Sequence, residues 1–377
     1  MRMNNIKAVV VTGCDSGIGY GICSALLRKN YFVIAGCYTK QGIKKVKKLY
    51  KSVFSSGDVS SYPSNRSDST KDSMDIVNNH ESDNLDHIIG QKKDDTGNLN
   101  EHLNSINTKR NVYRMGNRGM IMRLDVTSEE SVKELSSLVK ELIDTKQIPS
   151  LYSLINNSGI WRFSSLKECW NGDKLIESEV EEELERWKLV METNLMGSVR
   201  VSLRLLPFLA RYEGFARIIF ITSVVDETGV PGQSSYVSSK FALRGFHESL
   251  MHELEGTNIA TVTVAPGALS DTCLFDYDFK LNKEYRLNDT HRLKNGMKIL
   301  KKLGSSSKGV VKTVLKALES KRPRRYYRST SGTFLFKLMK LFPKSLYIKI
   351  AKLILLNFEH IYTSLPLLTK LIRLVLK

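Results

Sequence analysis

Six short apolar runs, separated by longer segments, are the feature that most constrains the fold of this chain. The runs are rich in β-branched side chains, which is typical of buried strands. They occupy residues 8–12, 31–37, 120–124, 151–155, 216–222 and 259–264. Because each connection is long enough for a crossover, all six strands are predicted to be parallel.

The segments between these runs show helical periodicity in five places. They span residues 19–29, 39–53, 128–143, 181–204 and 235–254. Ser128 is the predicted N-cap of its helix, with two glutamates in the first turn. This alternation predicts an α/β protein with a Rossmann-type, doubly wound parallel sheet covered by helices on both faces.

Two long segments depart from the pattern and set the predicted domain organisation. Residues 54–118 are rich in Ser, Asn and Asp without any period, which predicts a disordered, low-complexity insertion. Residues 1–53 and 119–280 then form a single domain around it. Residues 281–377 form a basic, apolar C-terminal region.

The net charge of +18 is concentrated in that C-terminal region. Residues 281–377 contain 23 basic and 4 acidic side chains, whereas the first 280 residues contain 34 and 35. Four arginines cluster at 322, 324, 325 and 328, but no recognised nucleic-acid module accompanies them. Nucleic acid is therefore not a predicted partner.

Residues 334–377 mix apolar side chains with regularly spaced lysines. The longest uncharged run, residues 360–369, has ten residues and contains Pro366, so a transmembrane helix is not predicted. Two interpretations stay open with equal weight. The segment lies in a membrane interface with its lysines at anionic headgroups, or it forms a lid over a substrate site.

A glycine-rich turn, Thr-Gly-Cys-Asp-Ser-Gly-Ile-Gly at residues 12–19, joins the first strand to the first helix. Glycines there allow a tight turn and let backbone N–H groups approach a pyrophosphate at the positive end of the helix. The pattern indicates a dinucleotide site, and the alternative is a glycine-rich turn without a ligand.

Tyr236 and Lys240 are four residues apart and therefore share one helix face, while Ser223 follows the end of a strand. A lysine cation beside a phenol lowers the phenol's pKa, and a tyrosine so adjusted can exchange a proton with an alcohol oxygen. Taken alone, a Tyr-x-x-x-Lys pair more often marks an exposed helix face.

Together these motifs resemble the short-chain dehydrogenase/reductase family, and they occur in the family's order. They are TGCDSGIG at 12–19, LDVT at 124–127, NNSG at 156–159, METNLMG at 191–197, ITS at 221–223, YVSSK at 236–240 and PG at 266–267. NNSG stands where the family usually has NNAG. The sequence is similar in particular to the retinol and hydroxysteroid dehydrogenase branch, which includes 3-hydroxybutyrate dehydrogenase.

The resemblance implies four catalytic roles. Tyr236 is the general acid/base, Lys240 lowers its pKa and binds the nicotinamide ribose, Ser223 bonds the reacting oxygen, and Asn194 holds a water of the proton relay. The implied cofactor-binding residues are Gly13, Ser16, Gly17, Ile18, Gly19, Asp125, Val126, Asn156, Gly159, Tyr236, Lys240, Pro266 and Gly267.

Among these, Asp125 is expected at the adenine and Asn156 at the adenosine side. The family's usual Thr after Pro-Gly is Asp271 here, with Thr272 one residue further on, so the contact to the nicotinamide amide is not assigned. No metal site is predicted, because the five cysteines show no paired spacing.

The resemblance implies an oxidoreductase that transfers a hydride between a nicotinamide cofactor and an apolar alcohol or ketone of the retinoid or steroid type. The alternatives are an enzyme for a small hydroxy acid, similar to 3-hydroxybutyrate dehydrogenase, and a catalytically weak paralogue that acts as an interaction protein. NAD is favoured over NADP because Asp15 adds negative charge in the glycine-rich turn, although Lys40, Lys44 and Lys45 lie nearby in the sequence.

The expected location is a membrane surface facing a reducing compartment, with the endoplasmic reticulum favoured and the cytoplasm or mitochondrion as alternatives. The sequence leaves the substrate, the direction of turnover and the formation of a homo-oligomer open.

Overall fold

A computed structural model of the protein describes residues 6–55, 112–275 and 288–329, with positions 343, 345, 346, 349 and 357. Its main sheet has the strand order β10-β9-β8-β5-β1-β2-β4-β3. Seven strands are parallel to their neighbours, and β3 is antiparallel to β4. The strands are β1 (Ala8–Val11), β2 (Phe32–Cys37), β3 (Val112–Arg114), β4 (Gly119–Arg123), β5 (Leu151–Asn156), β8 (Ala216–Ile221), β9 (Ile259–Ala265) and β10 (Tyr326–Arg328).

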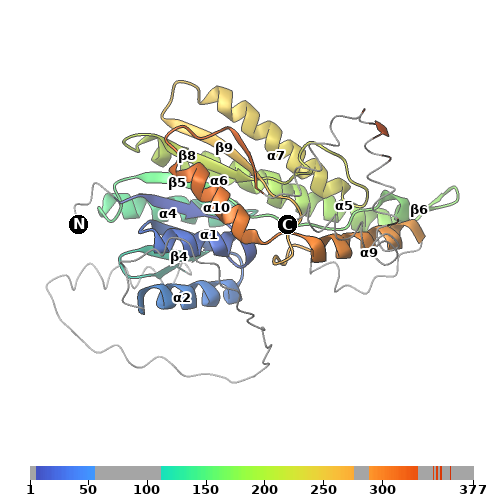
Figure 1. The fold of residues 1–377 in the computed structure, drawn as a ribbon, viewed down its shortest axis with the longest axis horizontal. Coiled ribbons are helices and arrows are strands. Elements are labelled where there is room, and N and C mark those ends of the chain that lie inside the picture. The colour runs from blue at the N-terminus through green and yellow to red at the C-terminus, as the bar shows by residue number, and fades with distance from the viewer. Residues whose placement is uncertain are drawn as a thin grey trace, which may run out of the picture.

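Helices cover both faces of this sheet (Figure 1). Alternate side chains of the strands pack against α1 (Gly17–Arg28), α2 (Lys40–Ser55) and α10 (Ser307–Glu319). The side chains between them face α4 (Glu129–Asp144), α6 (Gly197–Ala210) and α7 (Ser234–Glu253). A sheet buried on both faces favours strands that are largely apolar, which explains the six runs in the sequence. The predicted doubly wound α/β fold is confirmed.

The sheet extends past both domain boundaries that the sequence predicts. Strand β3 lies inside the segment assigned to the insertion, and α10 and β10 lie inside the region assigned to the tail. Both strands have only three residues and none of β10 is fully buried, so neither gives an apolar signal. Residues 56–111, most of the predicted insertion, lie outside the described residues, as do most of residues 330–377.

The tail region also closes the core. Buried Val310, Val314 and Leu318 of α10 pack in the same cluster as α1. At the end of α10, Glu319 pairs with Lys29 at 2.8 Å. The exposed lysines of α10 make the segment basic in composition, and for this reason it is assigned from the sequence to the basic C-terminal region and not to the core.

The long helix predicted over 181–204 is two helices joined by a wider turn. Helix α5 (Glu177–Met191) leads into a π-helical turn, Glu192–Met196, which continues as α6. The predicted cap of α4 is confirmed, because the backbone N–H of Ser131 donates to the Ser128 hydroxyl at 3.2 Å. Within the described ranges, no helix is long and apolar enough to span a bilayer.

Candidate active site

The three residues Ser223, Tyr236 and Lys240 meet where β8 ends. Ser223 lies in the turn after β8, and the other two lie on α7. Tyr236 forms a hydrogen bond with Ser223. The Nζ atom of Lys240 lies 5.6 Å from the centroid of the Tyr236 ring and donates to the carbonyl of Ile221 at 3.1 Å. The predicted trio is therefore assembled around one phenol.

Burial dominates the titration of this trio. It raises the pKa of Tyr236 to about 12, while the hydrogen bond with Ser223 lowers it and the charge of Asp226 raises it further. Burial also lowers the pKa of Lys240 to about 8. The sequence-based expectation that the lysine charge lowers the phenol's pKa is therefore outweighed here, because both groups are desolvated together.

Asn194 lies in the π-helical turn and is fully buried. Its Oδ1 accepts from the N–H of Ile160 at 2.8 Å, and its Nδ2 donates to the carbonyl of Ile160 and to the hydroxyl of Ser239, each at 2.9 Å. A Cβ added at Gly159 would lie 3.3 Å from Oδ1 of Asn194 and 3.4 Å from Nζ of Lys240. The absence of a side chain at Gly159 therefore leaves a narrow space beside both polar groups.

The glycine-rich turn has the shape that the sequence predicts. Gly13 and Gly17 have φ angles of +69° and +55°, which favour glycine. A Cβ at Gly19 would lie 2.1 Å from the carbonyl oxygen of Gly13. The side chain of Asn157 fastens the turn, since its Nδ2 donates to the carbonyls of Thr12 and Gly13 at 2.9 and 3.0 Å.

Ser16 is the N-cap of α1, but no side-chain hydrogen bond caps this helix. Its first N–H groups, which include those of Ile18 and Gly19, thus face the carboxyl edge of the sheet without a side-chain acceptor among the described residues. Such donors at the positive end of a helix match the oxygens of a pyrophosphate. The turn therefore fits a dinucleotide.

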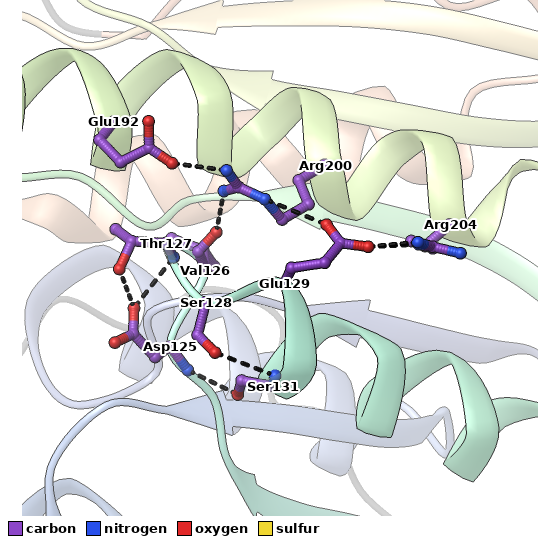
Figure 2. Close-up of polar contacts among 9 residues, drawn as sticks. All are labelled: Asp125, Val126, Thr127, Ser128, Glu129, Ser131, Glu192, Arg200 and Arg204. Carbon is purple, nitrogen blue, oxygen red and sulfur yellow. Dashed lines mark hydrogen bonds and ion pairs between the residues drawn. The ribbon is translucent and has the colours of Figure 1, made fainter.

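The segment after β4 is held by two sets of polar contacts (Figure 2). Oδ1 of Asp125 accepts from the N–H and the hydroxyl of Thr127, at 2.9 and 2.7 Å. Arg200 of α6 donates to the carbonyl of Val126 at 2.7 Å, and the Val126 side chain packs on Gly197. These contacts fix the predicted adenine-side residues against α6.

The side chain of Asn156 points toward α6. It is buried and donates to the hydroxyl of Ser202 on α6 at 3.0 Å, away from the glycine-rich turn. Successive side chains of a strand point to opposite faces, so Asn156 faces α6 whereas Asn157 faces the turn. The expected contact of Asn156 with the adenosine side stays a prediction.

The loop after β9 joins the remaining predicted residues. The carbonyl of Pro266 accepts from the N–H of Val224 at 2.9 Å, which ties the Pro266-Gly267 loop to the Ser223 turn. Asp271 turns away and accepts from the N–H of Ser307 at 2.8 Å at the start of α10. Thr272 lies against Gly17, 3.2 Å from the position of an added Cβ. Thr272, one residue later than the family pattern, therefore stands beside the glycine-rich turn.

Tyr236 belongs to an apolar cluster that is distinct from the two clusters containing the strand side chains. Trp161 is fully buried there, with Phe275 packed edge-on at a centroid distance of 4.7 Å. Helix α9 (Asn288–Leu303) contributes Leu293 and Met297 to the same cluster. Residues of the predicted C-terminal region thus share an apolar cluster with Tyr236.

The described part of the chain contains no group of three or more His, Cys, Asp or Glu side chains that could hold a metal ion. Its cysteines are free thiols, and only Cys273 is exposed.

The family model for short chain dehydrogenase matches residues 97–280, which include the Ser223, Tyr236 and Lys240 motif. This match covers slightly less than half of the chain and confirms, over those residues, the resemblance to the short-chain dehydrogenase family. The match begins in the segment predicted as an insertion, so the glycine-rich turn lies N-terminal to it.

Two relatives illustrate the range of this family. The mitochondrial D-beta-hydroxybutyrate dehydrogenase of Mus musculus is 28% identical over 262 residues, covering 69% of this chain and 54% of the relative. The 17-beta-hydroxysteroid dehydrogenase type 6 of Bos taurus is 24% identical over 261 residues, covering 69% and 56%. The chain thus spans about half the length of these curated relatives.

Solved structures share the fold. A short-chain dehydrogenase/reductase from Burkholderia phymatum in complex with NAD matches with a TM-score of 0.59 and 14% identity, over 90% of this chain and 95% of its own. An alcohol dehydrogenase from Thermococcus sibiricus complexed with 5-hydroxy-NADP matches with a TM-score of 0.53 and 18% identity, over 86% and 96%.

Proposed function

We propose that this protein is a nicotinamide-dependent oxidoreductase that interconverts an alcohol and its carbonyl compound. The observation that carries the proposal is the hydrogen-bonded Ser223–Tyr236 pair beside Lys240, at the same sheet edge as a glycine-rich turn that fits a pyrophosphate. The glycine-rich turn and the N-terminus of α1 would hold the phosphates, and Lys240 would bind the nicotinamide ribose.

The bound nicotinamide supplies the hydride or accepts it. The chain's own residues handle the proton and the orientation. Ser223 holds the substrate oxygen, Tyr236 moves the proton at its hydroxyl, and the polar groups of Lys240 and Asn194 around Gly159 continue the path inward. The buried phenol is protonated at neutral pH, as reduction of a carbonyl requires.

The preference for NAD rests on Asp15. Its carboxylate accepts from the N–H groups of Tyr38 and Thr39, at 2.9 and 2.8 Å, directly after β2. The end of the second strand is where Rossmann proteins distinguish the 2′-hydroxyl of NAD from the 2′-phosphate of NADP. A fixed carboxylate there repels a phosphate, whereas an exposed Lys40 contributes on the order of 1 kcal/mol or less.

The ratio of kcat/KM for the two cofactors, measured with one substrate, tests this preference. We expect NAD to be favoured. A tenfold preference for NADP would show that Lys40 or its neighbours prevail over Asp15, and Lys40→Glu should then reverse it.

The apolar cluster around Tyr236 supports an apolar substrate of the retinoid or steroid type. Trp161, Phe275 and Met297 offer no charged group for a small acid. The likeness to D-beta-hydroxybutyrate dehydrogenase favours the second candidate, a small hydroxy acid. Assays of cofactor reduction with retinol, hydroxysteroids and 3-hydroxybutyrate distinguish the two.

Tyr236→Phe tests the activity itself. The ring keeps its packing and only the hydroxyl is lost, so folding and cofactor binding should persist. Turnover should fall by about 10²–10⁴-fold, the range for a positioned acid/base. A variant that keeps more than about a tenth of wild-type turnover would exclude Tyr236 as that group and favour a protein that acts through its interactions.

We further propose that the protein associates with anionic membrane surfaces. The α1, α2 and α10 face is strongly basic, since Glu319 is the one acidic side chain on these helices and it pairs with Lys29. The exposed lysines are Lys40, Lys44, Lys45, Lys48 and Lys51 on α2, and Lys308, Lys312 and Lys316 on α10. Residues 334–377 add apolar and basic side chains in sequence.

Flotation with vesicles that contain phosphatidylserine tests this association. Truncation after residue 333 keeps β10 and α10, so the core should fold while binding falls. If the full-length protein fails to float, the membrane proposal is wrong. If the truncated protein floats but no longer turns over substrate, the tail acts as a lid. The name of the Mus musculus relative supports a mitochondrial location, and the relatives described above give no support to the endoplasmic reticulum.

A further inference from the structure

Asp226 is a buried carboxylate that the proposed chemistry does not use. It lies three residues after Ser223, and its exposed fraction is 1%. Its backbone N–H donates to the carbonyl of Ser223 at 3.0 Å, which closes the turn that presents the serine hydroxyl. A charge at this depth needs partners, because burying an isolated carboxylate costs several kcal/mol.

The last strand of the sheet supplies one of those partners. The hydroxyl of Tyr326 on β10 donates to the two carboxylate oxygens of Asp226, at 3.0 and 3.2 Å. Thr222, immediately before Ser223, bonds the same carboxylate. The carboxylate therefore joins the Ser223 turn to a strand that enters the sheet about 100 residues later.

Charged groups surround this contact. Arg244 of α7 approaches Asp226 at 3.8 Å and Glu227 at 3.1 Å, and Arg328 of β10 pairs with Glu227 at 2.6 Å. The guanidinium carbon of Arg244 lies over the Tyr326 ring, 5.2 Å from the ring centroid. Burial raises the pKa of Asp226, and the bonds from Thr222 and Tyr326 and the two arginines counteract it.

We propose that Asp226 is a positioning residue of the active site, which holds the Ser223 turn against β10 and places a negative charge in the turn whose serine bonds Tyr236. The inference rests on the proposed function. It adds a residue outside the predicted motifs and makes the C-terminal region part of the catalytic unit.

The effect on the pair follows from charge alone. The carboxylate favours the neutral phenol and the protonated lysine, so it raises the pKa of both Tyr236 and Lys240. Removing the charge should therefore lower both values. Alcohol oxidation needs the deprotonated side of the pair, so the acidic limb of its pH profile should move to lower pH.

Asp226→Asn removes the charge and keeps the size of the side chain. Glu227→Gln is the matched control, because it removes the neighbouring carboxylate from the same arginine cluster without touching the Ser223 turn. We expect the acidic limb of kcat/KM for oxidation to move down by about 1 pH unit in Asp226→Asn, the effect of one unit charge in a partly buried site. In Glu227→Gln it should move by less than a third of that.

Tyr326→Phe keeps the charge but removes its hydrogen bond to β10. We expect this variant to lower kcat/KM without moving the profile, because the turn is released while the carboxylate stays. An unchanged kcat/KM would overturn the role given to β10.

A second measurement does not depend on turnover. Tyrosine labelled with ¹³C at Cζ reports ionisation by NMR, and Tyr236→Phe assigns the Tyr236 signal. Asp226→Asn should make that signal titrate at lower pH than in the wild type, with Glu227→Gln close to the wild type. If both variants move equally, or neither moves, the proposal for Asp226 is wrong. If the signal moves as expected but no substrate is turned over, Asp226 stands and the proposed activity fails.

Discussion

Lys240→Met should make the protein more stable at neutral pH while abolishing its catalysis. The ammonium of Lys240 is buried, with the Ile221 carbonyl as its hydrogen-bond acceptor. Its pKa falls from 10.5 to about 8 because burial disfavours the charged form. This fall corresponds to about 3 kcal/mol of unfavourable free energy below pH 8. The substitution also leaves the Ile221 carbonyl without its hydrogen bond, which lowers the free energy of unfolding by about 1 kcal/mol. The net gain at pH 7 is then about 2 kcal/mol.

The sign of the pH dependence makes this prediction specific. Below pH 8 the lysine is charged in both the folded and the unfolded chain, so the penalty is fully present. Between about pH 8 and pH 10.5 the folded protein has lost the proton and the unfolded chain has not, so wild-type stability rises with pH. The advantage of Lys240→Met should therefore shrink over that range.

Urea denaturation at pH 7 and pH 9.5 measures the effect, with cofactor reduction followed in parallel. Lys312→Met on the exposed side of α10 is the control, and its stability should stay within about 0.5 kcal/mol of the wild type at both pH values. The reasoning is refuted if Lys240→Met is less stable than the wild type at pH 7. It is also refuted if the difference between the two proteins is the same at both pH values.

Three further substitutions follow from the packing and are checked by denaturation, with turnover for the first. Gly159→Ala should lower turnover about tenfold or more with little loss of stability, because the added methyl group would lie 3.3 Å from Oδ1 of Asn194 and 3.4 Å from Nζ of Lys240. Gly245→Ala should stabilise the protein by about 0.5–1 kcal/mol, since Gly245 lies in the middle of α7 and an added Cβ would have no atom within 4 Å. Ser128→Ala should destabilise it by about 1 kcal/mol through loss of the α4 cap.

The parts of the fold that the sequence predicts are those buried on both faces. Strands such as β1 and β2 are uninterrupted apolar runs because helices cover them on either side, and the period of two disappears. Strands β3 and β10 lie at the edges with three residues each, so local pattern carries no signal for them. The π-helical turn at Asn194 also has no sequence signal. It adds one residue to a single helical turn, and it has no glycine or proline at its centre.

Some residues of the candidate site can likewise be predicted from local sequence, and others cannot. Ser223, Tyr236 and Lys240 are found from spacing, since a helix places residues four apart on one face. Asn156 and Asn157 are adjacent and polar, and only the strand's register decides which one reaches the glycine-rich turn. The link from Asp226 to Tyr326 spans 100 residues, so no local motif contains it. The only local sequence feature that points to this link is the position of Asp226, three residues after Ser223.

The contact between the first helix and the last has a consequence for how the protein is made. Val310 and Leu318 of α10 bury the same apolar cluster that Ile22 and Leu26 of α1 line. While the chain is being synthesised, that side of α1 stays uncovered until α10 has left the ribosome, long after the strands around it have emerged. The nascent chain therefore exposes a hydrophobic surface until α10 emerges, and it should depend on holding chaperones over that interval.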